Sequence, residues 1–482
     1  MTNHKIETIL SDLFEKWAGT PPQLILPLAP SASNRVYYRL SANEKSAVGA
    51  YNSDKKENIA FLTFSKHFKS KGLPVPKIYA EDLDKNVYLQ EDLGATTLYS
   101  YLIQKGDYFP DYLVQIYKKV VEKLAYLQVE GGRDLDYSVC YPRASFDKQS
   151  MLWDFNTFKY YFLKLANIPF DEQALENDMH RFADYLLKAD CDNFMFRDFQ
   201  TRNIMIKNGE PIFIDYQGGR KGALQYDLAS LLYQPKANIP QDIIEELLNH
   251  YLDTLDKLTE VDREKFVEYF YAYVLIRRMQ AFGTYGFRGL YERKEIFIKN
   301  IPFALRTVKW ILENAQFPIE IPELKRVLRA AINSKKFEPF DKIKANSGLL
   351  TVKINSFSFK KGTPKDPSGH GGGFIFDCRF IHNPGRYEPY KKLTGRDEGV
   401  INFLKHHSKM TEFLNDVYRI VDKGVENYIE RSFTDLTVNF GCTGGQHRSV
   451  YAADCLANHI QEKYGVNIEL SHIVQEAKNW KN

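Results

Sequence analysis

Two short segments near the middle of the chain constrain its fold more than any other feature. Asp198 and Asn203 lie five positions apart, and Asp215 follows twelve positions after Asn203, at the end of the apolar run Ile212–Ile214. The intervening residues predict a hairpin, with a strand from Asn203, a polar turn around Gly209 and a second strand that ends at Asp215. Such a hairpin would carry Asn203 and Asp215 back toward each other.

Phosphoryl transfer from ATP needs side chains of these kinds close together. One carboxylate accepts the proton of the attacking hydroxyl, and a second carboxylate with a carboxamide holds the magnesium that bridges the phosphates. The spacing of Asp198 and Asn203 is typical of such a catalytic loop. Asp and Asn are also common turn residues, and the hairpin context is what favours catalysis. We therefore expect Asp198 to act as the base and Asn203 and Asp215 to bind Mg²⁺.

The composition fits a chain of several globular domains. The 482 residues are 44% apolar and carry a net charge of +4, which allows large cores and does not indicate nucleic acid or an anionic membrane as a partner. The five cysteines are an odd number without zinc-binding spacing, as in reduced cytoplasmic proteins. The N-terminal residues 1–17 read as an amphipathic helix rather than a signal peptide, and no apolar run reaches the ~20 residues of a membrane span. We expect a cytoplasmic protein without membrane contacts.

The periodicity of the apolar residues divides the chain into distinct parts. Residues up to about 95 read as strands with one or two helices, and helical periodicity then dominates to about residue 330, apart from the hairpin. A polar, lysine-rich stretch follows, and beyond it strands and helices alternate. This order predicts an α+β domain followed by a smaller α/β domain. We place the domains at residues 1–335 and 348–482, with a linker at 336–347.

Two segments of the strand-rich part have the composition of nucleotide-binding elements. The first is a polar loop whose hydroxyls, amides and single guanidinium could cover phosphates, although such a loop before a strand is usually only a turn. It contains Ser31, Ser33, Asn34 and Arg35. The second is a strand end whose backbone could face an adenine, and a plain strand end explains it equally well. It contains Gln90, Glu91, Asp92 and Leu93.

Five segments of the first domain carry a resemblance to a known family. They lie at residues 31–40, 89–94, 197–205, 214–222 and 225–232. Through them, residues of about 5 to 330 resemble the aminoglycoside phosphotransferase and choline kinase group, and within it the anomeric sugar kinases of the AmgK type. The resemblance implies a protein-kinase-like bilobal fold, ATP and Mg²⁺ as cofactors, and phosphorylation of N-acetylglucosamine or N-acetylmuramate at the anomeric hydroxyl. It implies Ser31 to Arg35 as the phosphate loop, and we expect Arg202, Gln217 and Arg220 to bind the acceptor.

Two departures from the family pattern bear on activity. Phe196 stands at the position where the catalytic loop of the family usually has His. In the family that His is mostly a scaffold residue. The strand Ser46–Tyr51 contains no Lys to pair with the ATP phosphates, so we expect Arg35 to take over part of this role and Glu57 to lack its usual ion-pair partner. The departures leave a second interpretation, a non-catalytic pseudokinase that binds nucleotide and acts as a regulatory or adapter protein for RNA or another protein.

The segment Gly441–Ser449 has the composition of an anion-binding loop between a strand and a helix. Its glycines let successive amides point inward, the helix N-terminus adds positive potential, and Arg448 can bind a phosphate with two hydrogen bonds. Cys442 and Arg448 also have the spacing of a cysteine-dependent phosphatase loop, in which a thiolate attacks phosphorus. The residues alone leave both interpretations open.

The second domain resembles a known sugar-phosphate-binding domain. Segments 356–362, 376–384, 393–397 and 441–449 carry a resemblance of residues 349–477 to the C-terminal domain of the RNase adapter protein RapZ. In that family the domain binds glucosamine-6-phosphate and mediates oligomerisation, which implies the same ligand class, a possible homo-oligomer and no phosphatase role. The P-loop domain of RapZ is replaced here, so its RNA-adapter role does not carry over. The residues expected to bind the sugar phosphate are Asp377, Arg379, Thr443, Gly444, Gly445, His447 and Arg448.

Both halves therefore resemble proteins of amino-sugar metabolism. We expect a sugar kinase fused to a module that senses an amino-sugar phosphate, with a role in the recycling of cell-wall precursors.

Overall fold

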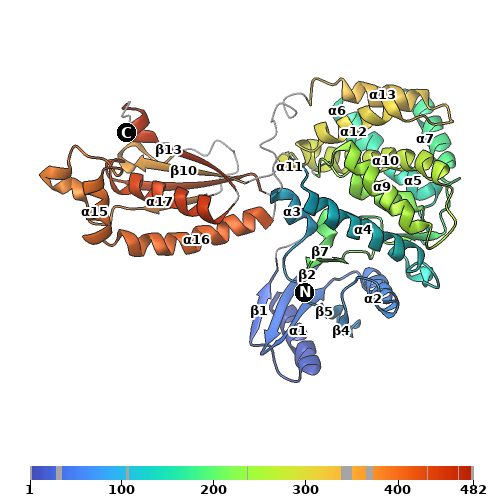
Figure 1. Cartoon of the computed structure of the whole chain (residues 1–482), viewed down its shortest axis with the longest axis horizontal. Coiled ribbons are helices and arrows are strands. Elements are labelled where there is room, and N and C mark those ends of the chain that lie inside the picture. The colour runs from blue at the N-terminus through green and yellow to red at the C-terminus, as the bar shows by residue number, and fades with distance from the viewer. Residues whose placement is uncertain are drawn as a thin grey trace. The chain divides into compact units, whose positions relative to one another are not determined.

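The computed structural model of the chain describes residues 3–28, 35–104, 108–235, 237–337, 350–364, 373–430, 433–464 and 466–478. The chain divides into two compact units, Met1–Ile343 and Lys344–Asn482. The helices and strands of each unit are labelled in Figure 1. The predicted domain boundaries stay predictions, because most of the predicted linker at 336–347 lies outside the described residues.

The strand-rich lobe of the first unit is a five-stranded sheet with the order β1-β2-β3-β5-β4, in which all neighbours are antiparallel. The amphipathic helix α1 packs on the sheet through Ile6, Leu10 and Phe14, which recur at helical spacing and are buried with Leu40 and Leu89. The bounds are Asn3–Ala18 for α1, Leu24–Pro27 for β1, Val36–Ala42 for β2, Lys45–Tyr51 for β3, Lys55–Ser70 for α2, Ile78–Asp82 for β4 and Val87–Glu91 for β5.

The second lobe of this unit is helical (Figure 1), and most residues of the larger buried apolar cluster of the unit lie in it. Helix α10 lies at its centre, in contact with α5, α8 and α12, and it is apolar on nearly all sides, as a buried helix should be. The bounds are Leu98–Gln104 for α3, Asp111–Val129 for α4, Lys148–Thr157 for α5, Lys164–Ala166 for α6, Glu172–Leu186 for α7, Leu224–Leu232 for α8, Gln241–Leu255 for α9, Arg263–Tyr285 for α10, Glu295–Ile298 for α11, Ile301–Asn314 for α12 and Pro322–Ile332 for α13.

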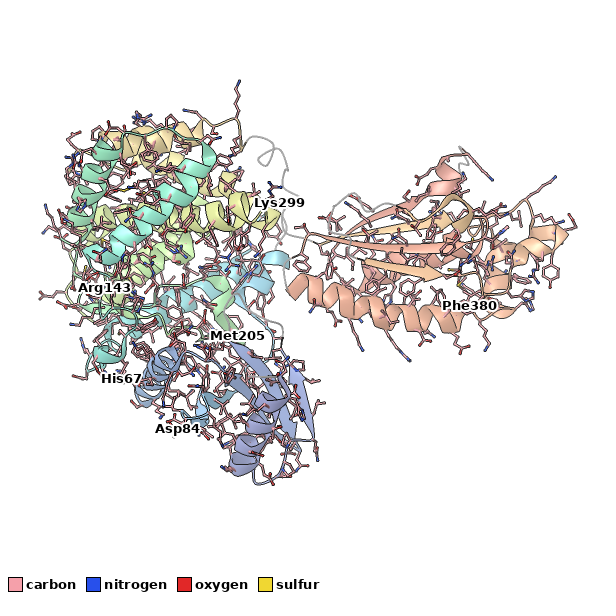
Figure 2. The ribbon with its side chains drawn as sticks, turned by 180° about the vertical axis from the view of Figure 1, so that it is seen from behind. His67, Asp84, Arg143, Met205, Lys299 and Phe380 are labelled. Atoms are coloured by element: carbon pink, nitrogen blue, oxygen red, sulfur yellow. The ribbon has the colours of Figure 1, made fainter. Side chains whose placement is uncertain are left out.

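Two small antiparallel sheets lie where the lobes of the first unit meet. The predicted hairpin is formed by β7 and β8, and Asn208 and Gly209 at its tip both have positive φ, as the tight hairpin turn requires. Met205 on β7, labelled in Figure 2, pairs with Thr97, and His67 on α2 contacts the Gly131 carbonyl across the lobes. The strands are β6 (Asn193–Met195), which pairs with β9 (Arg220–Gly222), and β7 (Ile204–Lys207), which pairs with β8 (Glu210–Phe213).

The second unit is the predicted small α/β domain. Its four-stranded sheet has the order β11-β12-β10-β13 with every pairing parallel, so each connection must cross back to the start of the sheet. Helices make the crossings from β11 to β12 and from β12 to β13. Val352, Ile354, Val438 and Phe440 of the two central strands are buried. The bounds are Thr351–Ser358 for β10, Gly373–Asp377 for β11, Glu398–His406 for α15, Met410–Glu430 for α16, Asp435–Cys442 for β12, Arg448–Lys463 for α17, Asn467–His472 for β13 and Ile473–Glu476 for α18.

The helices were also compared with the dimensions of a bilayer. Among the described residues, none of the helices is both long enough and apolar enough to cross a membrane.

Candidate active site and anion-binding loop

The loop from Phe196 to Asn203 is anchored by a buried carboxylate. Asp227 on α8 accepts hydrogen bonds from the amides of Phe196 at 2.7 Å and Arg197 at 2.9 Å, and from the side chain of Gln128 at 3.0 Å. Arg197 has a φ of +84°, in the left-handed region that turns the chain sharply. Burial raises the pKa of the Asp227 carboxyl to about 7. The shape of the loop is therefore set by α8.

Arg197 points into the helical lobe and leaves its neighbour facing outward. Its Nη2 lies 2.7 and 2.8 Å from the two carboxylate oxygens of Asp154, and its guanidinium stacks 5.2 Å from the ring centroid of Tyr226. Asp198, the next residue, has a side chain that is 56% exposed, and its Oδ1 lies 3.5 Å from Nη2 of Arg277. The predicted base is thus accessible, with a fixed cation beside it.

The structure brings Asp198, Asn203 and Asp215 together. Nδ2 of Asn203 donates to the backbone carbonyl of Asp198 at 2.9 Å, and the amide of Ile214 donates to the carbonyl of Asn203 at 3.0 Å. Asp215 follows directly, with a φ of +73° that turns its side chain out of the hairpin. Desolvation and the negative charges of Asp198 and Glu57 raise the pKa of the Asp215 carboxyl. The carboxylates therefore lie close enough to repel each other.

These side chains fit a magnesium ion. Asn203 uses its Nδ2 for the backbone and keeps Oδ1 as an acceptor, and Oδ1 of Asp215 is held by Nε2 of Gln217 at 2.9 Å. Oxygen donors suit Mg²⁺, which is usually bound by one or two carboxylates together with water and phosphate oxygens. No group of three or more His, Cys, Asp or Glu side chains placed for a metal occurs in the described ranges. A metal here would depend on these two ligands and on the phosphates of a nucleotide.

Arg35 occupies the position that the missing lysine leaves open. Its side chain is 1% exposed, its Nη2 lies 3.2 Å from Oε2 of Glu57 on α2, and its Nη1 lies 3.9 Å from Oδ1 of Asp215. The expectation that Glu57 lacks a partner is therefore wrong. The cation comes from the residue just before β2, whereas the sequence pattern points to β3. The other members of the predicted phosphate loop, Ser31, Ser33 and Asn34, lie outside the described residues.

Neither Lys45, the first residue of β3, nor Lys55, the first residue of α2, contributes to this site. Nζ of Lys45 donates to the carbonyl of Ala18 at 2.8 Å, and Nζ of Lys55 lies 3.3 Å from Oδ1 of Asp84, an exposed pair. The positive charge near Asp215 therefore comes from Arg35, which precedes β2 and is held by Glu57 of α2.

The predicted adenine-facing segment keeps its acidic side chains within the protein. Oε1 of Glu91 lies 2.8 Å from Nζ of Lys207, and the Asp92 carboxylate accepts two hydrogen bonds from Arg39 at 2.8 and 3.1 Å and one from Ser46 at 2.7 Å. The same segment includes Gln90 and Leu93, at the end of β5 and just beyond it. A ligand of this segment would have to use its backbone groups, as the sequence suggests.

The three predicted acceptor-binding residues take different orientations. Gln217 contacts Asp215 through Nε2, while its Oε1 is buried without a hydrogen-bond partner among the described residues. Arg202 is exposed and stacks 4.6 Å from the ring centroid of Tyr99. Arg220 is buried, and its guanidinium donates to a carbonyl of its own turn at 3.1 and 3.0 Å. Gln217 is thus the one that the structure places directly beside the predicted metal ligands.

Four aromatic rings connect the catalytic loop to the strand-rich lobe. The ring of Phe196 lies 5.9 Å from that of Tyr216, Tyr216 lies 5.1 Å from Phe61, and Phe61 lies 5.2 Å from Tyr88. All four are buried, and the Tyr216 hydroxyl is 2.6 Å from Oγ of Ser65. Phe196 therefore packs as a scaffold residue, as expected for the position where the family usually has His.

The sequence analysis did not identify two residues of this site. Asp154 holds Arg197, and Arg277 contacts Asp198 while its Nε donates to Oγ of Ser230 at 3.1 Å. A usable signal was present for Arg277, because it is one of two adjacent arginines in a helix that is otherwise apolar on nearly all sides. Charges at such positions need partners.

In the second unit, the predicted anion loop Gly441–Ser449 lies at the C-terminal end of β12 and the start of α17. Arg448 is buried, and its Nη1 donates to the carbonyls of Arg379 at 2.9 Å and Ile381 at 2.7 Å. Its Nη2 lies 3.4 Å from Oγ1 of Thr443. Arg448 therefore ties the turn after β11 to the loop.

The other predicted sugar-phosphate residues lie either within this loop or at the end of β11 and shortly after it. Asp377 forms an ion pair with Arg379 at 2.6 Å, and both side chains are exposed. Nε2 of His447 lies 2.9 Å from the Tyr390 carbonyl, and burial lowers the pKa of His447. The remaining members are Thr443, Gly444 and Gly445, of which Gly445 has a φ of +65°.

Cys442 is buried beneath this loop. The amide of Gly445 donates to its Sγ at 3.1 Å, and Oγ of Ser449 lies 3.2 Å from it. Burial opposes ionisation, but the contacts with Ser449 and the charge of Arg448 lower the pKa of the Cys442 thiol. A phosphatase needs the loop amides and the arginine directed at a phosphate. Here the Gly445 amide faces the sulfur and Arg448 faces carbonyl groups, so the geometry does not favour thiolate attack.

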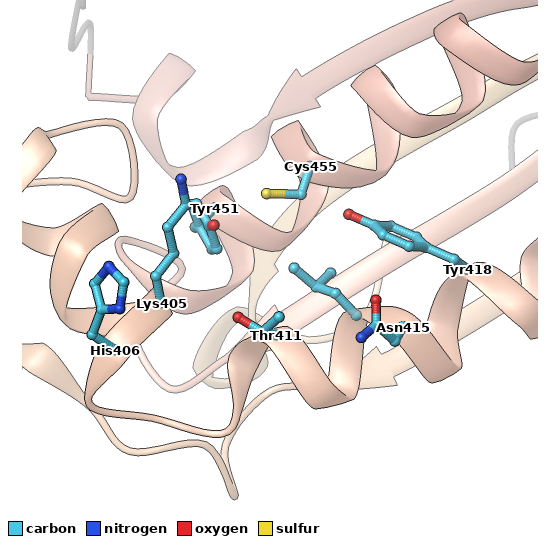
Figure 3. Close-up of a pocket in the computed structure, with 8 residues that line it drawn as sticks. Lys405, His406, Thr411, Asn415, Tyr418, Tyr451 and Cys455 are labelled. Carbon is cyan, nitrogen blue, oxygen red and sulfur yellow. The ribbon is translucent and has the colours of Figure 1, made fainter.

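A separate cavity of about 410 Å³ lies between α15, α16 and α17 (Figure 3). None of the predicted sugar-phosphate residues lines it. The lining residues are Lys405, His406, Thr411, Leu414, Asn415, Tyr418, Tyr451 and Cys455.

Comparisons with known proteins divide the chain in the same way. Residues 25–262 match the model of the phosphotransferase enzyme family, and residues 350–475 match that of the RapZ C-terminal domain. A nucleotide-binding protein of Thermosipho melanesiensis is 34% identical over 168 residues, which cover 33% of this chain and 58% of the relative. One of Psychrobacter sp. (strain PRwf-1) is 30% identical over 218 residues, 43% of this chain and 63% of the relative. The chain thus spans less than two thirds of the length of these relatives.

Solved structures that align with the chain include two kinases. Choline kinase LicA from Streptococcus pneumoniae is 18% identical, with 64% of this chain and 99% of that chain covered and a TM-score of 0.43. Amicoumacin kinase hAmiN is 13% identical, with 67% and 97% covered and a TM-score of 0.48. By the family models, residues 25–262 are similar to the phosphotransferase enzyme family and residues 350–475 are similar to the RapZ C-terminal domain.

Proposed function

We propose that the first unit is an ATP-dependent kinase that phosphorylates a hydroxyl of an amino sugar, at the anomeric position of a substrate such as N-acetylglucosamine or N-acetylmuramate. The observation that carries the proposal is the meeting of Asp198, Asn203 and Asp215 on anchored loops, with Arg35 beside Asp215. The match to the phosphotransferase family supports the class of reaction. The choice of sugar rests on the resemblance of the sequence segments.

The residues of the site divide the chemistry between them. Asp198 accepts the proton of the attacking hydroxyl, and Arg277 fixes the position of its carboxylate. Asn203 and Asp215 hold Mg²⁺, which neutralises charge on the phosphates when it is bound. Arg35, held by Glu57, faces the phosphates from the strand-rich lobe. The backbone at residues 90–93 receives the adenine.

We further propose that the second unit binds an amino-sugar phosphate at the Gly441–Ser449 loop and reports on the supply of cell-wall precursors. The match to the RapZ C-terminal domain and the position of the loop at a helix N-terminus support a phosphate ligand. Assembly into a homo-oligomer through this unit and a cytoplasmic location are parts of the same proposal.

A kinase assay over N-acetylglucosamine, N-acetylmuramate, glucosamine and related sugars tests the first proposal. We expect Asp198→Ala to lower kcat by about 10³-fold or more while nucleotide binding persists, because the base is lost and the phosphate contacts remain. Asp192→Ala is a matched control, since Asp192 is exposed and, among the described residues, forms an ion pair with Lys221 alone. No turnover of any sugar, with wild type equal to Asp198→Ala, would reject the proposal.

The alternative of a non-catalytic pseudokinase makes a different prediction. It rested on the missing lysine and on Phe196, and the ion pair between Arg35 and Glu57 supplies the cation that the strand lacks. A pseudokinase would bind ATP without turnover of any acceptor and would retain a stable RNA or protein partner in a pull-down. The same assay and a pull-down from lysate therefore separate the two functions.

A further inference from the structure

Arg278 is a buried guanidinium for which the described protein provides no partner. Its side chain lies on α10, directly after Arg277, and the residue is 2% exposed. Across the described ranges, its Nε and Nη1 have no hydrogen-bond partner and no carboxylate forms an ion pair with it. Burial lowers the pKa of Arg278 to about 10, so the side chain still carries a positive charge at neutral pH.

The other buried arginines in the described part of this unit, and the half-buried Arg197, all have partners. Arg35 is held by Glu57, Arg197 by Asp154, and Arg277 by Asp198, while Arg220 donates to backbone carbonyls. A buried charge without a partner is costly to the folded state. Arg278 is therefore an exception within a lobe that otherwise compensates its charges, and exceptions of this kind are typical of functional sites.

Arg278 follows directly after the arginine that contacts the catalytic carboxylate. The preceding residue, Arg277, reaches Asp198 at 3.5 Å. The charge of Asp198 raises the pKa of Tyr226 on α8, and Tyr226 in turn raises the pKa of Arg278. The ring of Tyr226 lies 5.2 Å from the guanidinium of Arg197. Arg278 thus adds positive charge to α10, the helix that contacts Asp198, whereas Arg35 belongs to the strand-rich lobe.

We infer that the acceptor carries an anionic group, a carboxylate or a phosphate, that Arg278 binds while Asp198 faces the reacting hydroxyl. The inference rests on the proposed kinase function and narrows its substrate class. A guanidinium matches either anion with two parallel hydrogen bonds. A neutral sugar leaves Arg278 unpaired, and a cationic acceptor is repelled by it. The site therefore selects acidic sugars over neutral sugars and over sugars with a free, cationic amine.

Three acceptors that share an anomeric hydroxyl test the inference. N-acetylmuramate offers a carboxylate, N-acetylglucosamine-6-phosphate offers a phosphate, and N-acetylglucosamine is neutral. We expect kcat/KM of the wild type to be at least about tenfold higher for one of the anionic sugars than for the neutral one, because an unpaired buried polar group discriminates strongly. The anionic sugar with the higher kcat/KM shows whether the acceptor group that Arg278 binds is a carboxylate or a phosphate.

Variants of Arg278 connect this preference to one side chain. Arg278→Met should remove the preference, mainly by raising KM for the anionic sugar at least about tenfold, and should leave the neutral sugar within about threefold. Arg278→Lys should restore part of it, since a lysine keeps the charge without the fork. Arg329→Met, an exposed arginine on α13, is the matched control. Equal use of neutral and anionic sugars by the wild type, or an equal loss for both in Arg278→Met, would overturn the inference.

Calorimetry without ATP separates this inference from the kinase proposal, because binding needs no turnover. Wild type and Asp198→Asn should bind the anionic sugar alike, and Arg278→Met should bind it at least about tenfold more weakly. Arg278→Met should also unfold at a higher temperature than unliganded wild type, because an uncompensated charge has gone. Binding that depends on Arg278 without any turnover would reject the kinase reaction and keep the anion site. Binding that ignores Arg278 would reject the anion site alone.

Discussion

The guanidinium of Arg35 lies 3.2 Å from the carboxylate of Glu57, and this pair joins the residue before β2 to the first turn of α2. Asn52 donates to the same oxygen of Glu57 at 2.9 Å, so the carboxylate is held from two sides. Burial acts to lower the pKa of Arg35, but Tyr88, Tyr37 and Asp215 raise it by more. The guanidinium therefore stays charged. The pair therefore fixes a permanent cation next to Asp215.

Glu57→Gln should weaken the use of ATP. Without the carboxylate, Arg35 loses its anchor and is drawn to Asp215, so we expect kcat/KM for ATP to fall by about tenfold or more, as for a buried charge-paired hydrogen bond. Steady-state kinetics at varied ATP measures this. Glu81→Gln is the control, because Glu81 forms an exposed pair with Lys66, and such pairs contribute little. Equal kinetics for the two variants would contradict a role for the pair.

Asp227 should give the first unit a stability that declines as pH rises. Its pKa is raised from 3.8 to about 7 in the folded protein, so the folded state binds a proton more tightly than the unfolded state. The full stability is present below pH 4 and is lost as the pH rises to about 7, by up to roughly 4 kcal/mol at about 1.4 kcal/mol per pKa unit.

Asp227→Asn removes this titration and also replaces one acceptor of the loop amides. We expect the variant to be less stable than wild type at pH 5 and the difference to narrow by pH 8, because only the wild type is destabilised by ionisation. Urea unfolding at several pH values measures it. A difference that widens with pH would show that the ionised carboxylate, with its three donors, is the favoured form.

Phe196→Ala should damage both stability and turnover. The ring is buried and lies in contact with Tyr216 and Phe199, so its loss should cost about 3–5 kcal/mol. Because the amide of Phe196 is held by Asp227, a shifted backbone would also move Asp198. Tyr291→Ala removes a ring that is 66% exposed and should change the unfolding free energy by less than about 0.5 kcal/mol. Unchanged stability of Phe196→Ala would argue against the scaffold role.

The anion loop offers a matched pair of glycines. A Cβ on Gly445 would lie 2.5 Å from Cγ2 of Val474 and 3.0 Å from the amide of Ser358, at a φ of +65°, whereas a Cβ on Gly444 meets no atom within 4 Å. We expect Gly445→Ala to lower the thermal unfolding temperature of the second unit and Gly444→Ala to leave it close to wild type. Differential scanning calorimetry of the full chain measures both. Equal unfolding temperatures would mean that the loop relaxes freely.

Local pattern was enough to predict the hairpin and the parallel domain. Alternating apolar residues around a turn at Asn208 and Gly209 specify β7 and β8 without help from the rest of the chain. That hairpin alone brings Asn203 next to Asp215. Helices between strands likewise predict the α/β order of the second unit.

The contacts that escaped prediction all join residues far apart in the chain. Arg277 contacts Asp198 because α10 passes through the centre of the lobe. Asp227 accepts hydrogen bonds from the amides of the catalytic loop because α8 packs behind that loop. Arg35 reaches Glu57 because sheet and helix pack in a particular register. Packing geometry of this kind is not encoded in spacing or composition, so a single sequence does not reveal it.

The position of a guanidinium beside Asp215, where the family pattern leads one to expect a lysine, has a practical consequence. Nucleotide analogues that label kinases by acylation require a lysine amine beside the phosphates. In the described part of this site, Lys45 and Lys55 contact Ala18 and Asp84 instead, and the cation beside Asp215 is Arg35. We therefore expect surveys with such probes to pass over this protein even when it is fully active.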